Sequence, residues 1–263
     1  MREGAGCTGG QKVVFMKIGL IGFGSIGYVL AKNIGKDIIW VVDSDPPAEG
    51  RMESAGLSCP FHSGVPEKCG GADLVLEAAS QRAVPLLVEC LRFCDVMVMS
   101  VGAFSDDSLL AKIKKEAEKH GRKIYLPSGA VGGLDAISAV SSQITSLVLE
   151  TTKPPASLGR NDEARTVVFE GSAREACRMF PKNVNVSATL SLAGIGFDRT
   201  IVRIVSDPAA IANTHRIIVA SPAGGMKFEF ENVPSRDNPK TSALAALSAL
   251  RRISKTGETL QIG

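Results

Sequence analysis

The sequence lacks the features of several large classes of protein. It contains no run of about 18 apolar residues, so we predict no membrane span. Aromatic residues make up only 5% of its 263 residues, which argues against a stacking surface for single-stranded nucleic acid. Its 30 lysines and arginines nearly balance its 27 aspartates and glutamates, leaving a net charge of +3. So small a charge indicates neither nucleic acid nor a membrane surface as a partner.

Cysteine is also scarce. The six cysteines are too few and too irregularly spaced for a secreted disulfide framework, so we expect a cytoplasmic protein with reduced thiols. Cys90 and Cys94 are four residues apart and could share a helix face. No second Cys or His pair is placed to complete a metal site with them. We therefore interpret both as buried small side chains and predict no metal.

What remains is the composition of a folded globular protein, with 44% hydrophobic and 22% charged residues. The length predicts one large domain or two small ones. Residues 1–15 carry scattered charges and no sustained apolar segment, which is not the pattern of a signal peptide. We expect them to form a disordered extension before Met16.

The strongest motif follows this extension. An apolar segment over residues 17–22 leads into GFGSIG at residues 22–27, which has the spacing G-x-G-x-x-G. A helical segment over residues 28–34 and a second apolar segment over residues 38–42 come next, and the latter ends at Asp43. This order of strand, glycines, helix, strand and acid is typical of dinucleotide binding.

Each position of the motif has a physical role. Gly22 permits a tight turn, Gly24 lets a pyrophosphate approach the backbone, and Gly27 lets the helix pack on the strand. The free N–H groups where the helix opens, which we place at Ser25 and Ile26, would hold the phosphates.

Asp43 bears on the choice of cofactor. It lies 19 residues after Gly24, where a carboxylate can accept hydrogen bonds from both ribose hydroxyls. A carboxylate repels a 2′-phosphate, so the residue favours NAD, although Arg51 could soften this preference and leave NADP possible.

The alternation of strands and helices continues to residue 127. Further strands are predicted over residues 73–79, 95–102 and 123–126, with helices over 84–93 and 108–120. Such alternation predicts an α/β fold with a Rossmann-type parallel sheet. Ligands bind at the carboxyl ends of these strands, where the chain has small-residue turns at 78–80, 100–103 and 127–130. We count Ala79 and Ser80 among the cofactor-binding residues.

The pattern changes after residue 127. A glycine-rich segment leads to a predicted helix over residues 134–146, and later segments suit an α+β domain with a mostly antiparallel sheet. Its strands are predicted at 146–152, 165–170, 201–206, 214–220 and 225–231, and its other helices at 173–180 and 187–192. An apolar helix over 242–254 is expected to return to the first domain. The predicted domains are therefore 16–127 with 238–263, for dinucleotide binding, and 128–237, for catalysis and oligomerisation.

The segment before the last helix predicts an anion site. Asn238 is a good N-cap and Pro239 a good first helical residue. The positive helix end, with Arg236 and Lys240 beside it, would attract an anion. Helix capping alone is the simpler interpretation of the same residues.

His215 is the candidate base. It begins an apolar strand in the second domain, and histidine titrates near neutral pH. His62 lies in a Pro/Gly-rich segment and His120 ends a lysine-rich helix, so we interpret both as structural or solvated.

Six stretches together resemble the L-aspartate dehydrogenase family. They are GFGSIG at 22–27, EAASQ at 77–81, SVGAF at 100–104, SGAVGGLDA at 128–136, FPKNVNVSATLSLAG at 180–194 and ENVPSRDNPKTSALAALSAL at 231–250. The resemblance spans nearly the whole chain from Met16 onward, and the last two stretches are far more specific than the glycine motif. The extension before Met16 departs from the family's usual length.

The resemblance implies NAD(P)-dependent oxidation of L-aspartate to iminoaspartate, a role in NAD biosynthesis, and a homodimer or homotetramer formed through the second sheet. His215 matches the family's catalytic histidine, and Ala130 and Asn185 match its nicotinamide-side contacts. We expect the two substrate carboxylates to be bound from the segment before the last helix. The residues concerned are Arg236, Asn238, Lys240 and Thr241, with Lys182 behind them.

Three other functions stay open. A reductase similar to dihydrodipicolinate reductase would share the nucleotide domain and act on another imine. A phosphorylating aldehyde dehydrogenase would need a thiolate nucleophile, and neither Cys94 nor Cys177 lies in a recognisable nucleophile context. A non-catalytic module that senses NAD would bind the cofactor without turning over any amino acid.

Overall fold

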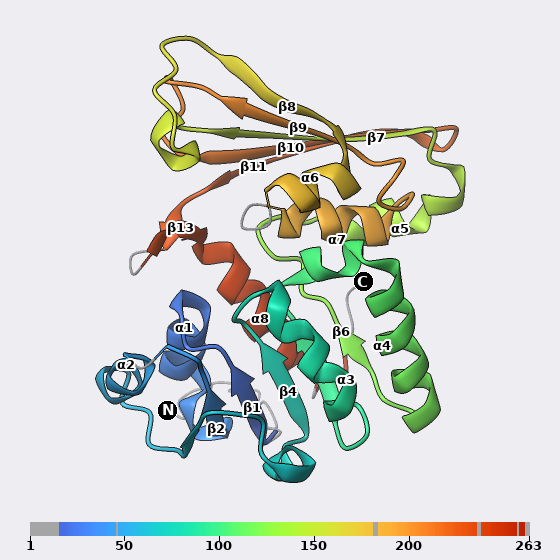
Figure 1. Ribbon diagram of the computed structural model, residues 1–263. Coiled ribbons are helices and arrows are strands. Elements are labelled where there is room, and N and C mark those ends of the chain that lie inside the picture. The colour runs from blue at the N-terminus through green and yellow to red at the C-terminus, as the bar shows by residue number, and fades with distance from the viewer. Residues whose placement is uncertain (1–15, 46, 181–183, 236–237, 257, 261–263) are drawn as a thin grey trace, which may run out of the picture.

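A computed structural model of the protein places one sheet above another, with helices between and around them (Figure 1). The structure describes residues 16–45, 47–180, 184–235, 238–256 and 258–260, and the side chains of residues 234–241 lie outside that description. The predicted extension before Met16 also lies outside the described residues.

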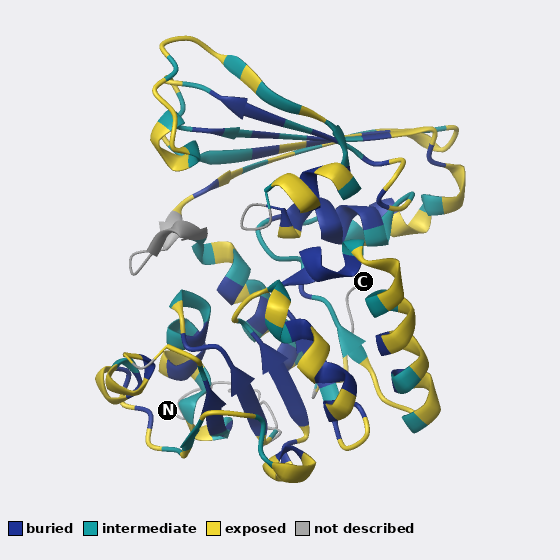
Figure 2. Ribbon diagram, in the orientation of Figure 1, coloured by how far each residue is buried: buried dark blue, intermediate teal, exposed yellow. Residues whose placement is uncertain are grey.

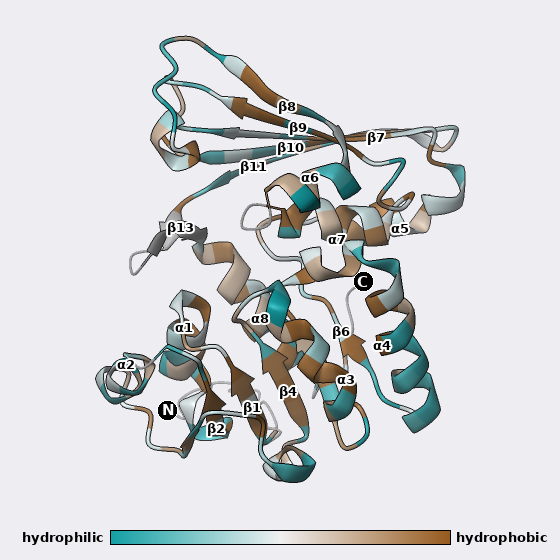
Figure 3. Ribbon diagram, in the orientation of Figure 1, coloured by the Kyte–Doolittle hydropathy of each residue, from teal (hydrophilic) through white to brown (hydrophobic). Residues whose placement is uncertain are grey.

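The first sheet has six parallel strands in the order β3-β2-β1-β4-β5-β6. They are β1 (Ile18–Ile21), β2 (Ile38–Val42), β3 (Phe61–His62), β4 (Leu74–Glu77), β5 (Asp95–Val98) and β6 (Ile124–Tyr125). The strands are short apolar runs that are mostly buried and hydrophobic (Figures 2 and 3), as expected of a sheet covered on both faces. The parallel Rossmann-type sheet predicted from the sequence is confirmed.

Helices cover both faces of this sheet. On one face, α1 (Ser25–Ile34), α2 (Ala48–Ser54) and α8 (Ala243–Lys255) pack over residues such as Leu76. On the other, α3 (Leu87–Cys90) and α4 (Asp107–His120) pack over residues such as Val75. Successive strand residues point to opposite faces, so β4 alone contributes to both cores. The chain order reverses between β1 and β4, which is where ligands bind in such folds.

The second sheet has five strands in the order β11-β10-β7-β9-β8. They are β7 (Ser146–Lys153), β8 (Thr166–Ser172), β9 (Ile201–Ser206), β10 (Asn213–Ser221) and β11 (Gly224–Asn232). Only the β7–β9 pair is parallel among these neighbours, which confirms the mostly antiparallel sheet. One face is covered by α5 (Leu134–Ala139), α6 (Ala173–Met179) and α7 (Asn185–Ala193), whereas no α-helix in the described part of the chain lies over the other (Figure 1).

The two halves of the molecule share one hydrophobic core. Val88 and Ile113, over the first sheet, belong to the same buried cluster as Ala176 and Ala188 on α6 and α7. The link runs through the 3₁₀ turn Val101–Ser105, whose apolar side chains are buried in this cluster. The second sheet is therefore held in a fixed position above the carboxyl ends of the first.

Several elements differ from the sequence prediction. The helix expected over 84–93 is a 3₁₀ turn at Gln81–Leu86, which contains Pro85, followed by the short α3. The helix expected over 134–146 ends at Ala139, before a 3₁₀ turn at Ser141–Gln143. The prediction also missed the short α2 and β3.

The helix expected over 242–254 is α8 (Ala243–Lys255), but its N-cap was predicted wrongly. Asn238–Ser242 forms the strand β13, which pairs with β12 (Pro234–Ser235), so Asn238 is not the helix N-cap. The N-cap is Ser242, whose side chain accepts a hydrogen bond from the backbone N–H of Leu244 at 3.2 Å. A serine oxygen is as good a cap as an asparagine, and the strand pairing decides between them.

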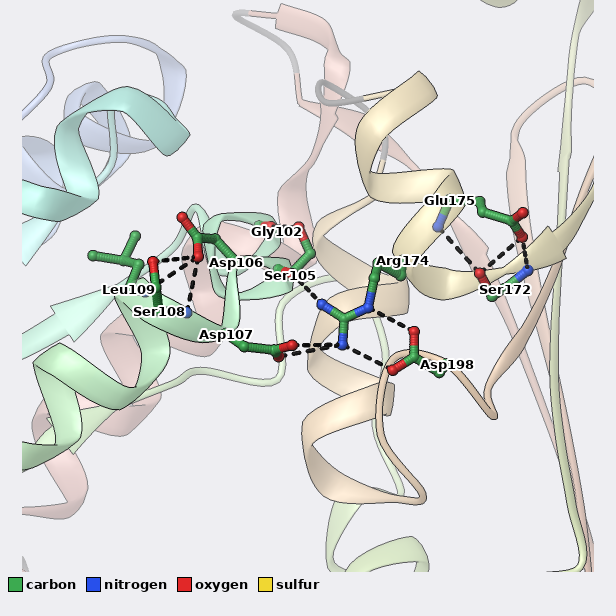
Figure 4. A network of polar contacts seen from close by, with 10 residues as sticks. All are labelled: Gly102, Ser105, Asp106, Asp107, Ser108, Leu109, Ser172, Arg174, Glu175 and Asp198. Atoms are coloured by element: carbon green, nitrogen blue, oxygen red, sulfur yellow. Dashed lines mark hydrogen bonds and ion pairs between the residues drawn. The ribbon is translucent and has the colours of Figure 1, made fainter.

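Arg174 on α6 ties the second domain to the first (Figure 4). Its guanidinium donates to the backbone carbonyl of Ser105, at the end of the 3₁₀ turn, and pairs with Asp107, the first residue of α4, at 3.2 Å. Two further hydrogen bonds of 2.6 and 2.9 Å go to Asp198. These partners raise the pKa of Arg174, mainly through the hydrogen bonds with Asp198.

We expect Arg174→Ala to lower the free energy of unfolding by about 1–2 kcal/mol, somewhat below the roughly 1.5–3 kcal/mol typical of hydrogen bonds to charged groups. The two aspartate side chains are 74% and 69% exposed, so solvent screening keeps the loss from being larger. Urea unfolding measures it, with Lys112→Ala on the exposed side of α4 as the control. Equal losses in the two variants would contradict the role of Arg174.

Candidate active site

The turn between β1 and α1 has the geometry that a dinucleotide needs. Gly22 has φ +98°, and a Cβ there would lie 2.6 Å from the backbone of Ala79. A Cβ on Gly27 would lie 2.5 Å from the carbonyl oxygen of Gly22, so the helix start could not pack as it does. A Cβ on Gly24 would meet nothing within 4 Å. The first and third glycines are therefore needed for packing, and the second leaves open space where a pyrophosphate would lie.

The start of α1 is suited to bind phosphate. The helix begins at Ser25, followed by Ile26, and its N-cap Gly24 offers no side-chain hydrogen bond. The N–H groups of the first turn are therefore not capped by that residue. Such N–H groups and the helix dipole favour an anion.

Asp43 lies beside this turn. Its carboxylate accepts hydrogen bonds from the backbone N–H groups of Phe23 at 2.6 Å and Asp45 at 2.8 Å. Arg51 on α2 donates to the carbonyl of Phe23 at 3.1 Å and pairs with Asp45 at 2.8 Å. The predicted ribose-binding carboxylate is thus fixed in place, and the nearby cation already has an acidic partner.

Glu77, at the end of β4, fixes the turns at the carboxyl edge of the first sheet. Its fully buried carboxylate accepts hydrogen bonds from the N–H of Ala79 at 2.8 Å, and from the N–H and hydroxyl of Ser100 at 2.9 and 2.8 Å. Burial raises the pKa of Glu77, and these hydrogen bonds oppose that rise. The sequence reasoning missed this residue, whose signal is an acidic residue ending an apolar run. Ala79 and Ser80, which follow Glu77 in the chain and were predicted to bind the cofactor, are exposed.

Asn185 comes to this edge from the second domain. It is the first residue of α7, and its Oδ1 accepts a hydrogen bond from the backbone N–H of Gly102 at 3.1 Å. A Cβ on Gly102 would lie 2.3 Å from Nε2 of Gln81 and 3.3 Å from Oδ1 of Asn185. The glycine therefore allows the close approach that brings Asn185 to the turn after β5.

Ala130 lies at the crossing between the domains. Its carbonyl accepts a hydrogen bond of 3.0 Å from the side-chain amide of Asn232, at the end of β11. The other end of the same amide, Oδ1, accepts from the hydroxyl of Ser242 at 2.8 Å. Asn232 thus links Ala130, the predicted contact of the nicotinamide, to both the second sheet and the start of α8.

His215 lies on β10, on the face of the second sheet that the helices cover. Its ring is 7% exposed, and Nδ1 lies 2.9 Å from the hydroxyl of Thr151 on β7. Burial, followed by the charge of the nearby Lys153, lowers the pKa of His215 to about 4. The imidazole is therefore neutral at neutral pH and able to accept a proton.

The predicted substrate-binding residues are not tested by the structure. Lys182 and Arg236 lie outside the described residues, as do the side chains of Asn238, Lys240 and Thr241.

The remaining predictions about cysteine and histidine concern other parts of the fold. Cys90 and Cys94 are each 1% exposed within the first core, which confirms that they are buried small side chains. His120 is partly buried and pairs with Glu116 at 3.0 Å, and His62 is partly buried on β3.

Within the described ranges, no three Cys, His, Asp or Glu side chains are grouped to hold a metal ion. No helix in that part of the chain could cross a membrane.

Comparison with known proteins covers both domains. Residues 135–256 match the family described as aspartate dehydrogenase, C-terminal, and residues 18–127 match the NAD binding domain of homoserine dehydrogenase. The L-aspartate dehydrogenases of Methanosarcina acetivorans and Methanopyrus kandleri are each 40% identical, over 94% of this chain and 99% and 98% of theirs. The crystal structure of aspartate dehydrogenase from Thermotoga maritima is similar with a TM-score of 0.80 and 31% identity, over 94% of this chain and 99% of that one.

The lowered pKa of His215 makes a prediction about acid stability. Between pH 6.5 and about 4, the unfolded chain carries a proton on His215 whereas the native state does not. The contribution of His215 to the free energy of unfolding is therefore complete above pH 6.5 and is lost as pH falls through this window. At 1.36 kcal/mol per pKa unit the loss is about 3 kcal/mol. We measure the fall in the free energy of unfolding between pH 7 and pH 4 by urea unfolding. In His215→Gln this fall should be smaller than in the wild type by the same amount.

Proton NMR checks the same property directly, because the chain has only three histidines. The His215 ring signal should titrate near pH 4. A midpoint near 6.5, the ordinary value for histidine, would contradict the effect of burial and of Lys153.

Proposed function

The chain belongs to the L-aspartate dehydrogenase family, and we propose that it catalyses the oxidation of L-aspartate to iminoaspartate with a nicotinamide cofactor. The observation that carries the proposal is the neutral, buried imidazole of His215, on the domain that also supplies Asn185. Hydrolysis of the imine would then give oxaloacetate and ammonia. As in the family that it resembles, the imine would serve NAD biosynthesis.

The first domain would hold the cofactor, which supplies the acceptor for a hydride from the substrate Cα. The open space at Gly24 and the start of α1 would take the pyrophosphate, and Asp43 would take the ribose hydroxyls. The carboxylate of Asp43 favours NAD over NADP because it repels a 2′-phosphate, and Arg51 is engaged by Asp45. Asn185 and Ala130 would orient the nicotinamide from the side of the second domain.

His215 would act as the base. The substrate amine must be neutral before its carbon can release a hydride, and a neutral imidazole can accept that proton directly or through a water molecule. The hydroxyl of Thr151 contacts Nδ1, so it leaves Nε2 as the ring nitrogen for the proton transfer. The same nitrogen could later activate water for hydrolysis of the imine.

The open face of the second sheet supports assembly into a dimer or tetramer. It is crossed by ion pairs, among them Arg216 with Glu229 at 2.6 Å and Arg203 with Glu150 at 3.2 Å, and no α-helix of the described residues covers it (Figure 1). We also propose a cytoplasmic location, with which the free thiols of the five described cysteines are compatible.

The other functions considered are less well supported. An aldehyde dehydrogenase needs a reactive thiolate, yet Cys94 and Cys177 are 1% and 3% exposed and burial raises the pKa of Cys177. A reductase of another imine would share the first domain, but the family match extends over residues 135–256 of the second. The same match opposes a module that only senses NAD.

We expect the purified protein to form NADH from L-aspartate, with much slower turnover of D-aspartate, L-glutamate and L-alanine. In His215→Ala, kcat with L-aspartate should fall by about 10²–10⁴, the usual contribution of a general base. NADH binding, followed by its fluorescence, should stay unchanged because the first domain is intact.

His62→Ala, on the short β3, is the matched control and should keep wild-type kcat. Near wild-type turnover in His215→Ala would remove this residue from the mechanism. Absence of turnover in the wild type, despite NADH binding, would overturn the proposed function itself.

A further inference from the structure

Three of the five described cysteines lie together in the core of the first domain. Cys69, Cys90 and Cys94 are 3%, 1% and 1% exposed and belong to one buried cluster. The sulfur of Cys69 lies 3.9 Å from the carbonyl oxygen of Cys90, and the sulfur of Cys94 lies 3.5 Å from the same oxygen. The thiols of Cys90 and Cys94 also hydrogen-bond to the sulfur of Cys69. The proposed reaction uses none of these side chains.

The three thiols lie at the edge of the first sheet opposite to the cofactor turns. Cys69 belongs to the turn Glu67–Gly71 before β4, and Cys94 comes directly before β5. These strands are parallel neighbours, and their first residues, Leu74 and Asp95, pair with each other. A covalent bond between Cys69 and Cys94 would therefore join two segments that the sheet already holds side by side.

The backbone at Cys69 is strained. Its φ is +55° and that of Lys68 is +48°, and these are the only two residues other than glycine with a positive φ in the described part of the chain. Trp40 on β2 holds this turn, because its indole N–H donates a hydrogen bond of 2.8 Å to the carbonyl of Cys69. Strained residues that the surrounding structure holds in place are typical of functional sites.

The surroundings of Cys69 favour its ionised form. Hydrogen bonds from the thiols of Cys90 and Cys94 lower the pKa of Cys69, and burial opposes them. The thiolate, not the thiol, is the nucleophile in cysteine chemistry. The neighbours Lys68 and Gly70 are exposed, so a local opening of this short turn is enough to admit a small oxidant to Cys69.

We propose that Cys69 and Cys94 form a reversible disulfide when a peroxide oxidises the protein, which makes the pair a redox modification site of the first domain. The thiolate of Cys69 attacks one oxygen of the peroxide, and the O–O bond breaks. A sulfenic acid forms at Cys69, and the hydroxide that leaves takes up a proton as water. The thiol of Cys94 then attacks the sulfenic sulfur, the S–O bond breaks, and the proton of Cys94 leaves with the oxygen as a second water.

The two electrons that the sulfurs lose in this sequence reduce the peroxide to water. A low-molecular-weight thiol reverses the modification by two thiol–disulfide exchange steps, which restore both cysteines. Such a disulfide is compatible with the cytoplasmic location proposed above, because disulfides in that compartment are mostly transient and redox-sensing.

The directions of the thiols favour Cys94 over Cys90 as the partner. The sulfur of Cys90 lies 3.5 Å from the carbonyl oxygen of Leu86, one turn back, where its thiol can donate. Cys94 lies beyond the end of α3, next to the exposed Phe93, so its backbone is less constrained than that of Cys90 within the helix.

The test treats the full chain with hydrogen peroxide, alkylates the remaining thiols and analyses the unreduced digest by mass spectrometry. We expect a linked peptide pair that joins Cys69 to Cys94 and disappears on treatment with dithiothreitol. Trp40 is the only tryptophan, and its indole contacts the carbonyl of Cys69, so its fluorescence should change as the pair forms. Cys94→Ala should lose both the linked peptides and the fluorescence change.

Cys177→Ala is the matched control, because it removes another buried thiol from α6 in the second domain and should change neither signal. Cys90→Ala should keep the link to Cys94, formed more slowly because Cys69 loses one hydrogen bond. Circular dichroism checks that each variant is folded. Cys69→Ala should lose the same signals as Cys94→Ala, and it replaces that variant in the assay should Cys94→Ala fail to fold.

Oxidation of the partly buried Cys59 without a link between Cys69 and Cys94 would overturn the inference, since peroxide would then have reached the protein but not this pair. A link between Cys69 and Cys90 in the wild type would also contradict it, as would a fluorescence change that persists in Cys94→Ala. These measurements need no turnover of L-aspartate, so their outcome is independent of the proposed function.

Discussion

The carboxylate of Glu77 is the interaction on which the rest of the proposed site depends. It is fully buried, and its hydrogen bonds hold the turns after β4 and β5 at one edge of the first sheet. The turn after β5 contains Gly102, whose N–H binds Asn185 at the start of α7. Through this chain of contacts a buried carboxyl group in the first domain fixes the start of α7, in the second domain, against this edge. A buried carboxylate is stable only with such donors, so the geometry of the edge is closely defined.

In the second domain, strand pairing rather than a local sequence motif brings the candidate functional side chains together. Its covered face is apolar over most of its length and polar at one end, where Thr151 pairs with His215 and the buried Lys153 ends β7. Burial and the adjacent ammonium keep His215 neutral, which is the state that a base requires. The shared core between the domains then holds this polar end over the carboxyl edge of the first sheet.

The sequence was most informative where a residue type has a local backbone requirement. The turn between β1 and α1 could be predicted from the motif GFGSIG. Gly22 there has a positive φ, and Gly27 makes a close backbone contact. Partners far apart in the chain were not predictable. Glu77 and Ser100 are 23 residues apart, and Thr151 and His215 are 64 apart, so only strand pairing brings each pair together. The N-cap of α8 was misplaced for a related reason, since the pairing of β12 with β13 decides where that helix begins.

The central claim is that the carbon bearing the amine gives its hydride to a nicotinamide held between the two domains. L-Aspartate labelled with deuterium at Cα tests this most directly, with the reduced cofactor analysed by NMR and mass spectrometry. The account predicts NADH that carries the deuterium at C4 of the nicotinamide ring, on one face only. NADH formed without deuterium would contradict it.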